Sequence, residues 1–594
     1  MNYYYNRIVT VLFFLLLINT ATSQSTLRGK VVDSASRQPL ENVSVLNKNS
    51  PDDKTITDDN GNFSISVQSL PATLILSYIG YKGATMQVDS VYNLIAMGSA
   101  PVNLEDVVVF QNNHFSKFST VSKIDLDLKP VQNTQELLRL VPGLFIAQHA
   151  GGGKAEQIFL RGFDCDHGTD VQVSVDGIPV NMVSHAHGQG YADSHFIIPE
   201  TINDIDFGAG PYYTQHGNLN TAGYVSFSTF DNISKSKVQI EAGRFNTYRG
   251  LIMLDLLKKN KDKQSAYIAS EYYYTNGPTI NKQNFNRFNI FGKYNLAISN
   301  ATQLTASLSA FKSNWDASGQ VPTRAVESGI IDRFGSIDPT EGGNTERYNA
   351  NAVLTHTFYN GATWQNQAWF SRYKFNLYSD FTFFLNDAVN GDEINQAEER
   401  NAMGYLSKYE HISSLGKSSL HSLYGAGFRF DATHNSKLAH VVKRQFLDYY
   451  KLGNIKETNA FAFADEQLNV GKLLIDAGVR LDYFHSYYFD KLTSTQLPAR
   501  SESIISPKLN LQYTLNSKVQ FYIKSGKGFH SNDSRVVVEN SGRQILPAAY
   551  GIDIGAIIKP TGKLLINVAA WYLYLQQEFV YVGDDGNIEP SGKT

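Results

Sequence analysis

From about Lys235 onward, apolar and polar residues alternate over one segment after another. In one of these segments Val479 and Leu481 share one face of an extended strand, while Arg480 and Asp482 share the other. A face with Arg and Asp needs a polar surrounding, so the opposite face must contact something apolar. Repeated strands of this kind form either a soluble β-sandwich with an apolar core or a transmembrane β-barrel with an apolar outer surface.

The N-terminus and the composition favour the barrel. Residues 1–23 combine Arg7, an apolar run over 8–18 and the small residues 21–23, which is typical of a secretory signal peptide cleaved before Gln24. This run is shorter than the about 20 residues that a membrane-spanning helix needs, and no longer apolar stretch follows it. Aromatic residues make up 12% of the chain and charged residues only 18%, which suits a barrel with interfacial aromatic side chains in outer-membrane lipid.

Charge and motifs exclude several classes of function. A net charge of -3 gives no basic field for a nucleic-acid partner. The single cysteine, Cys165, rules out a disulfide framework and a four-cysteine zinc module. Neither a Gly-x-Ser-x-Gly nor a His-Glu-x-x-His motif is present, so we expect no enzyme and no required cofactor.

Changes in the pattern of expected strands, turns and helices divide the chain, after the signal peptide at residues 1–23, into three regions. Residues 24–100 contain short strands and an Asn60-Gly61 hairpin turn, which predict a small β-sandwich. Residues 101–232 mix strands with one helix at 135–140, which predicts an α+β domain. Residues 233–594 predict a large antiparallel transmembrane β-barrel, so the chain is mainly β overall.

The second region resembles the plug domain of TonB-dependent outer-membrane receptors, in the form usual for Bacteroidetes-like bacteria. The matching segments follow the family order: 104–109, 135–144, 158–163, 173–180, and 200–211 with 222–229. The resemblance implies plug-motif roles for Pro142, Gly143, Arg161, Gly162, Asp176 and Gly177. It also implies that residues 24–100 are the carboxypeptidase-regulatory-like domain that many such receptors carry.

The same resemblance identifies a coupling segment for the inner-membrane TonB complex, made of Glu105, Asp106, Val107, Val108 and Val109. Three consecutive valines in a polar linker can add as a free strand to the sheet of a partner. The alternative is an ordinary edge strand of the first domain.

The length suggests that part of the barrel is missing. Barrels in this family have about 22 strands around the plug. At roughly 25 residues per strand and loop, the chain after Lys235 supplies about 14. The chain also ends at Thr594 without a terminal aromatic strand, so we expect a C-terminally truncated fragment with an incomplete barrel.

Four of the 14 histidines fall between residues 167 and 195. The candidate substrate or metal contacts are therefore His167, His185, His187 and His195, together with Cys165. The alternative is that these side chains only bond plug loops to the barrel wall.

The sequence thus predicts energy-coupled uptake of a scarce substrate, with a metal ion or metal complex as the candidate. A secreted or surface-exposed β-rich binding protein without transport is the alternative.

Overall fold

The computed structural model describes residues 25–591, with gaps at 34–36, 49, 68–69, 79–83, 90–91, 98–104, 107–115, 118–130, 132–134, 149–151, 166, 234, 258–262, 417, 517, 540–544, 562–563 and 583–586. The predicted signal peptide lies outside the described residues. Two compact units are present: residues 1–100 with 561–563, and the remainder of the chain. Across the described ranges, every helix is too short or too polar to cross a bilayer.

The first unit is a β-sandwich, as predicted. One sheet has the strand order β4-β1-β7 and the other β3-β2-β5-β6. The strands are β1 (Ser25–Asp33), β2 (Ser44–Asn47), β3 (Ser50–Ile56), β4 (Asn62–Val67), β5 (Ala72–Ser77), β6 (Ala84–Val88) and β7 (Tyr92–Met97). Alternate residues of β4 and β5, including Phe63, Ile65, Leu74 and Leu76, are buried between the sheets and form the core.

The predicted Asn60-Gly61 hairpin is wrong, although the turn itself exists. Gly61 has a φ of +76°, and the Asp58 carboxylate accepts the backbone N–H groups of Asn60 and Asn62. The strands on either side, β3 and β4, belong to different sheets. Turn chemistry is local and does not decide which sheet the next strand joins.

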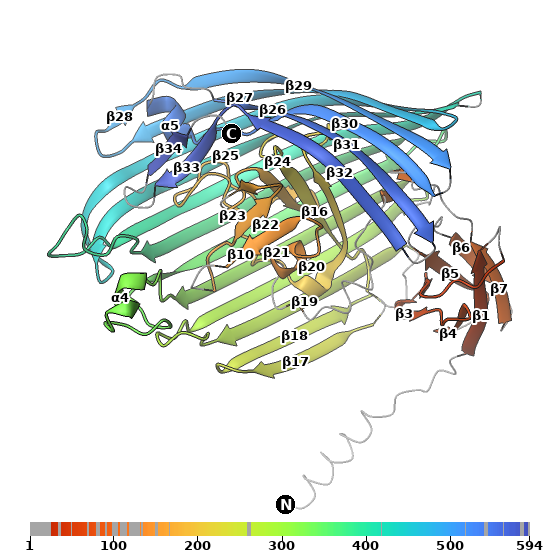
Figure 1. Ribbon diagram of the computed structural model, residues 1–594, viewed down its shortest axis with the longest axis horizontal. Helices are drawn as coiled ribbons and strands as arrows, with labels where there is room; N and C mark the ends of the chain where they lie inside the picture. Colours follow the sequence, from red (N-terminus) through yellow and green to blue (C-terminus); the bar gives the residue numbers. More distant parts are fainter. Residues whose placement is uncertain are drawn as a thin grey trace, which may run out of the picture. The chain divides into compact units, whose positions relative to one another are not determined.

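In the second unit, consecutive antiparallel strands form one sheet of 16 strands (Figure 1). They are β17 (Lys237–Gly243), β18 (Thr247–Asp255), β19 (Gln264–Thr275), β20 (Phe285–Ser299), β21 (Thr302–Asp316), β22 (Gly342–Thr357), β23 (Thr363–Ser379), β24 (Ile394–Leu415), β25 (Ser418–Val442), β26 (Gln445–Val470), β27 (Leu473–Asp490), β28 (Thr495–Gln496), β29 (Arg500–Asn516), β30 (Val519–Phe529), β31 (Ala548–Thr561) and β32 (Leu564–Leu575). A separate hairpin joins β33 (Glu578–Val582) and β34 (Asn587–Ser591). The strand number exceeds the expected 14 because several connections, such as 300–301 and 471–472, contain only two residues.

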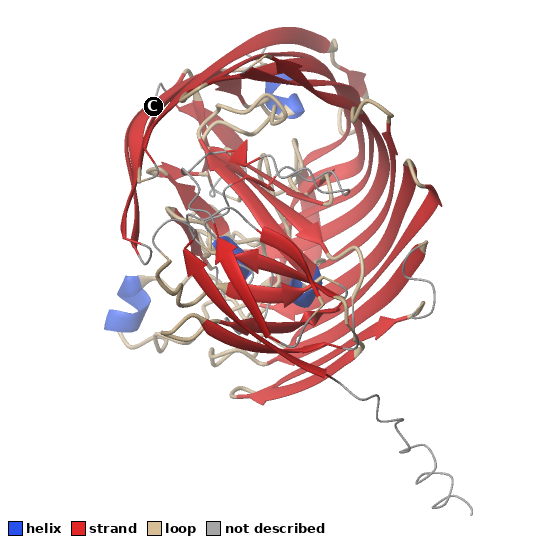
Figure 2. Ribbon diagram, turned by 90° about the vertical axis from the view of Figure 1, so that its right-hand side faces the viewer, coloured by secondary structure: helices blue, strands red, loops and turns tan. Residues whose placement is uncertain are grey.

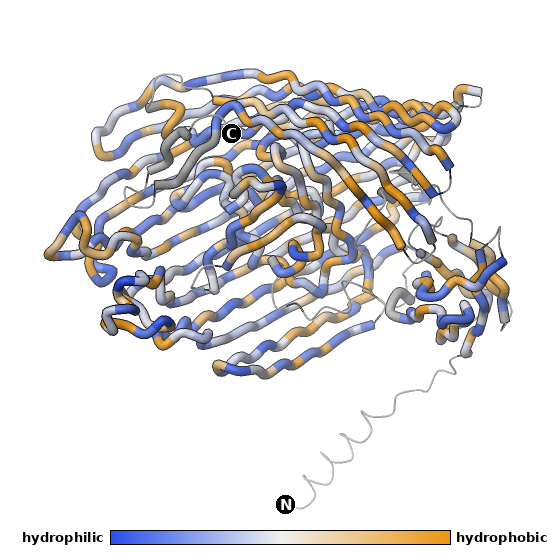
Figure 3. The backbone as a smooth tube through the Cα atoms, in the orientation of Figure 1, coloured by the Kyte–Doolittle hydropathy of each residue, from blue (hydrophilic) through white to orange (hydrophobic). Residues whose placement is uncertain are grey.

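Burial in this sheet is the reverse of that in a soluble sandwich. On β27 the side chains of Val479 and Leu481 are 44% and 48% exposed, whereas those of Arg480 and Asp482 are 4% and 0% exposed. Apolar stripes follow many of the strands (Figure 3). The apolar faces therefore point outward, as a lipid-facing surface requires, and the polar faces point inward.

The inner face encloses a small α+β domain (Figures 1 and 2). Its two sheets have the orders β10-β11-β12 and β14-β13-β16-β15. The elements are α3 (Gln135–Leu138), β10 (Leu144–Ala147), β11 (Gln157–Leu160), β12 (Phe163–Asp164), β13 (Val171–Val175), β14 (Ile178–Pro179), η1 (Pro199–Thr201), β15 (Ile202–Ala209) and β16 (Gly223–Thr229). We call this domain, residues 131–232, the inner domain.

The predicted helix at 135–140 is two residues shorter in the structure, because Arg139 and Leu140 already form a turn. Two further short helices lie in connections of the large sheet: α4 (Thr323–Glu327) between β21 and β22, and α5 (Ser534–Glu539) between β30 and β31.

Candidate functional site

The predicted coupling segment is described only in part. Glu105 and Asp106 form β8 (Glu105–Asp106), which pairs with β9 (Ser116–Lys117). Residues 107–109 lie outside the described residues. The role of this segment stays a prediction.

The predicted glycine motifs of the inner domain all occupy turns. Gly143 has a φ of +80° just before β10, and Pro142 precedes it. Arg161 and Gly162 make the turn between β11 and β12, both with positive φ.

Asp176 and Gly177 also have positive φ and join β13 to β14. The Asp176 carboxylate accepts the backbone N–H and the hydroxyl of Thr229 at 2.9 and 2.6 Å, which fixes this turn to the end of β16.

Arg161 forms a two-bond ion pair with Asp553 of β31 in the barrel wall. The Tyr212 hydroxyl donates to the same carboxylate, and the Trp571 ring lies 5.4 Å from the guanidinium carbon. A charge-assisted pair of this kind, shielded from water, ties the inner domain to the large sheet.

A second group of barrel side chains holds the loop 211–215. Lys508 donates to the carbonyl oxygen of Pro211 at 2.6 Å, and Asn510 donates to that of Tyr212 at 3.1 Å. Arg480 donates to the carbonyl oxygen of Thr214 at 3.3 Å. The inward polar face of the sheet is therefore used largely to bind the inner domain.

The histidine segment, residues 167–195, is the part of the inner domain that contacts strands β23 and β24. The Nε2 atoms of His167 and His187 face each other at 3.1 Å. The Nδ1 atom of His167 lies 3.3 Å from the carbonyl oxygen of Glu156, and that of His187 lies 2.8 Å from Oε1 of Gln396 on β24. Tyr191 packs against both rings.

His185 occupies the same cluster with a different set of contacts. Its ring stacks on Tyr191 at 4.3 Å between centroids, and Phe375 of β23 packs edge-on against it. Its Nδ1 accepts the backbone N–H of His187 at 3.2 Å, while its Nε2 lies 4.0 Å from the Glu398 carboxylate. Among the described residues this Nε2 has no hydrogen-bond partner.

Burial keeps this cluster neutral. His167, His185 and His187 are at most 3% exposed, and this burial lowers the pKa of each ring well below its ordinary value. The nearby Lys154 lowers the pKa of His167 and His187 further. Neutral imidazole is the form that binds metal ions.

The other two predicted contacts have partners of their own. Cys165 belongs to the main apolar cluster of the inner domain, and its Sγ points at the carbonyl oxygen of Phe163 at 3.8 Å. His195 bonds through Nδ1 to the Asp193 carboxylate at 2.8 Å. Within the part of the chain that the structure describes, no three His, Cys, Asp or Glu side chains are arranged to hold a metal ion.

The connection between β30 and β31 folds onto the histidine segment. Gln189 donates to the carbonyl oxygen of Ser531 at 2.7 Å and accepts the N–H of Asp533 at 3.1 Å. Arg535, at the start of α5, donates to the carbonyl oxygen of His185 at 2.6 Å. We call residues 530–535 the cover segment.

Sequence reasoning missed the barrel side of this cluster. Gln396, Glu398, Tyr373 and Phe375 follow the histidines by about 180 to 215 positions, and no local motif marks them. Tyr191, which packs against the same rings, lies inside the histidine segment and could have been found from its position there.

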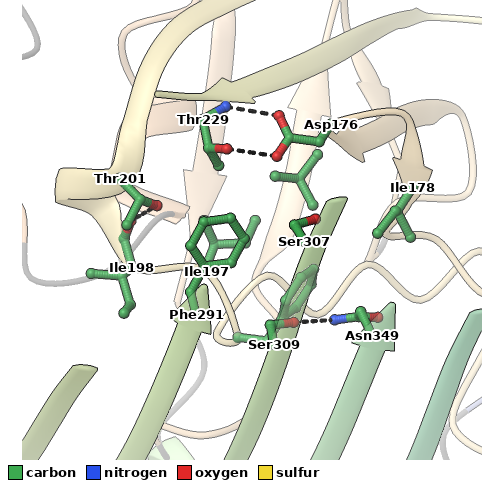
Figure 4. A pocket seen from close by; sticks show the side chains of 12 residues that line it. Asp176, Ile178, Ile197, Ile198, Thr201, Thr229, Phe291, Ser307, Ser309 and Asn349 are labelled. Atoms are coloured by element: carbon green, nitrogen blue, oxygen red, sulfur yellow. Dashed lines mark hydrogen bonds between the residues drawn. The ribbon is translucent and has the colours of Figure 1, made fainter. Parts of the chain in front are cut away.

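A small cavity lies elsewhere on the boundary, between the inner domain and strands β20 to β22 (Figure 4). Ile197, Ile198 and Phe291 line it, and its volume of about 20 Å³ is close to the least that holds one water molecule. It is too small for an organic substrate.

Three family models match the chain. Residues 113–224 match the TonB-dependent receptor plug domain, and residues 302–592 match the TonB-dependent receptor-like beta-barrel. Residues 27–109 match the CarboxypepD_reg-like domain.

Solved structures with the same fold include the ferric citrate transporter FecA in its unliganded form, with a TM-score of 0.67 and 16% identity over 77% of this chain and 69% of that one. The ferric yersiniabactin uptake receptor FyuA from Yersinia pestis has a TM-score of 0.60 and 14% identity over 77% of this chain and 71% of its own. The copper transporter OprC has a TM-score of 0.60 and 12% identity over 78% and 71%. At these identities the likeness shows the fold.

Proposed function

Because the chain belongs to the family of TonB-dependent receptors, which are outer-membrane transporters rather than enzymes, we propose that it takes up a metal ion or metal complex by TonB-driven transport. The observation that carries this proposal is the plug, which is the inner domain of residues 131–232. It lies inside a sheet whose apolar faces point outward and whose polar faces bond to it. Such a plug blocks the passage until an external force moves it.

The buried histidine cluster supports a metal-containing substrate. Imidazole nitrogen is a preferred ligand of zinc, copper, iron and nickel. The related structures named ferric citrate transporter, ferric yersiniabactin uptake receptor and copper transporter fit the same class. None of these names is transferred to this chain at 12 to 16% identity; they only make metal uptake the first hypothesis to test.

The coupling segment 105–109 is the part on which TonB is proposed to pull. A strand that adds to the sheet of a partner needs its backbone N–H groups, and proline removes one of them. We expect Val108→Pro to abolish uptake while substrate binding remains, and Val108→Ile, which keeps a β-branched residue, to retain both.

The measurement is accumulation of labelled substrate by cells with and without TonB, compared with binding to isolated membranes. Equal, energy-independent accumulation by the wild type and Val108→Pro contradicts TonB coupling. Recovery of the full-length wild type as a soluble periplasmic protein favours instead the secreted binding protein.

A further inference from the structure

We infer that a row of charged side chains on the outer surface of strands β21 to β24 binds the phosphate groups of a lipid headgroup in the outer leaflet of the membrane. The row contains one residue from each strand: Lys312, Glu346, Lys374 and Glu399. We call it the charged row. Because it lies on the outside of the barrel, its role is independent of the substrate that the receptor transports.

Strand register places these four side chains next to one another. Lys312 lies opposite Glu346, which lies opposite Lys374 on its other side. Lys374 in turn lies opposite Glu399. All four side chains point out of the barrel, since they are 24 to 58% exposed, whereas Arg400, the next residue on β24, is 2% exposed. The row is therefore a continuous band of alternating charge on the outer surface.

A row of aromatic side chains fixes the height of the charged row in the membrane. Trp364 precedes Lys374 by ten positions on β23, and Tyr409 follows Glu399 by ten positions on β24. Trp364 and Tyr409 lie opposite each other and also point outward. Ten residues span about 33 Å along a strand, which is about 25 Å of height at a tilt of about 40° and equals the apolar band of such barrels. The two rows therefore lie at the two boundaries of the hydrocarbon layer.

The connections between the strands show which boundary is which. On the side of the aromatic row the strands are joined by the short connections 300–301 and 358–362. On the side of the charged row they are joined by the longer connections 317–341 and 380–393. Short turns of outer-membrane barrels face the periplasm and long loops face the exterior. The charged row thus lies at the level of the outer-leaflet headgroups.

Arg372 lies between the charged row and the lipid. It is the next outward residue of β23 below Lys374, its side chain is 51% exposed, and its closest contact with Glu399 is 3.7 Å. A cation on the lipid face is costly at the centre of the bilayer and costs little near the boundary, where a headgroup can pair with it. The planar guanidinium group matches two oxygens of a phosphate group.

The charges around Arg372 favour an anionic headgroup. Lys312 pairs with Glu346 at 2.8 Å and Lys374 pairs with Glu399 at 3.0 Å, so Arg372 supplies one positive charge in excess. Exposed ion pairs of this kind are weak, and the two lysines can therefore turn to a stronger partner. A phosphate monoester carries between one and two negative charges at neutral pH.

Neighbouring strands add neutral hydrogen-bond donors at the same height. Tyr348 of β22 and Asn401 of β24 lie opposite Arg372 on either side. A tyrosine hydroxyl and an asparagine amide can both donate to phosphate oxygens. Lys312 and Lys374 stand two strands apart, about 10 Å between backbones, which their long side chains can bridge from both sides of one headgroup.

The test measures equilibrium binding of diphosphoryl lipid A to the detergent-purified full chain in mixed micelles, compared with lipid A stripped of its phosphate groups. We expect the wild type to bind the phosphorylated form about tenfold more tightly or better. The Lys312→Gln, Arg372→Gln, Lys374→Gln triple variant should bind both forms equally. Equal binding of the two lipids by the wild type overturns the inference.

The matched control is the Lys282→Gln, Arg324→Gln, Arg333→Gln triple variant. It removes the same number of exposed cations from connections rather than from the outer face of the strands. It should keep the preference of the wild type, and an equal loss in this control overturns the site. Inorganic phosphate is the free-anion comparison, and displacement of lipid A by an equimolar amount of it would overturn the lipid as the ligand.

A measurement on the wild type alone does not depend on how the variants fold. Raising the salt concentration from about 0.05 to 0.5 M shortens the range over which exposed charges act. The preference for diphosphoryl lipid A should then fall several-fold, while binding of the phosphate-free form stays the same. A preference that salt does not change would show that the phosphate groups do not contact these cations and overturns the inference.

Discussion

Individual polar side chains inside the plug each have defined partners. The Asn181 amide accepts the N–H of Val173 and donates to the carbonyl oxygens of Gly168, Val171 and Gly190. Removing such a group leaves buried backbone atoms unsatisfied, which generally costs more than the bond itself contributed. The plug is thus held in one conformation by side chains that its sequence alone marks only as polar.

Glu156 is a plug carboxyl group whose burial disfavours its charged form. It is 4% exposed, one carboxylate oxygen has no partner among the described residues, and burial raises its pKa to about 7. A carboxyl whose folded pKa is raised destabilises the fold as the pH rises from about 4.5 through 7. We expect Glu156→Gln to stabilise the protein by about 3 kcal/mol at most at pH 8 and to have little effect at pH 4.

Thermal unfolding in detergent at the two pH values measures this difference. The same shift at both pH values would mean that packing, not ionisation, is responsible.

Position 177 needs glycine for two reasons: its backbone has a positive φ, and the side chain of Gln367 leaves no room for a Cβ. Its φ is +77°, and a Cβ at this position would lie 2.4 Å from Oε1 of Gln367, whose amide bonds to Asp176 and Asn351. Gly177→Ala should cost about 2 to 4 kcal/mol, from backbone strain and two displaced hydrogen bonds.

Gly143→Ala is the matched control, because its φ is also positive but nothing lies within 4 Å of its Cβ. It should cost about 1 to 2 kcal/mol. Unfolding midpoints compare the two variants, and equal shifts would exclude a role for Gln367.

At the scale of elements, the cover segment differs from the barrel strands in how it is held in place. Plug side chains hold it in place of a strand ladder: Gln189 and Asn218 each form two hydrogen bonds with it. Segments attached in this way open more readily than the strands that carry them.

We expect Gln189→Ala to speed amide hydrogen exchange in residues 530–535 about tenfold or more, since it removes two bonds worth about 1 kcal/mol each. Exchange in β20 to β24 should not change. Gln172→Ala, which removes a plug glutamine bonded to His216 instead, is the control. Unchanged exchange in the cover segment would show that other contacts hold it.

Helices, strands and turns could be predicted where the sequence pattern that specifies them lies in neighbouring residues. The alternation around Val479 and the Asp176-Gly177 turn depend on residues adjacent in sequence, and the structure confirms both. The pairing of β3 with β2 and the packing of His185 against Phe375 depend on contacts across the chain. Periodicity and turn chemistry carry no information about such partners.

For the whole molecule, the first compact unit and the plug differ in which contacts stabilise their folds. The first unit has its own apolar core of buried residues such as Val31, Val45 and Leu74. The plug instead depends on barrel residues such as Asp553 and Lys508 for its polar contacts. The first unit should therefore fold without the rest of the chain.

We expect a fragment of residues 24–100 to be soluble, to show a β-type circular dichroism spectrum and to unfold in one cooperative transition. A plug fragment of residues 131–232 is the comparison and should lack cooperative unfolding. A non-cooperative first-unit fragment would mean that it needs contacts from the second unit.

The lengths of the barrel strands also divide the outer barrel surface into a part that faces lipid and a part that lies outside it. A tilted strand crosses the hydrocarbon layer with about 9 to 11 residues, yet β24, β25 and β26 have 22, 25 and 26. About half or more of each strand therefore lies outside lipid, where alternation does not constrain the outward side chains. These extensions can accept charged substitutions and changes in surface antigenicity, while the lipid-facing portions of the same strands must stay apolar for the protein to insert.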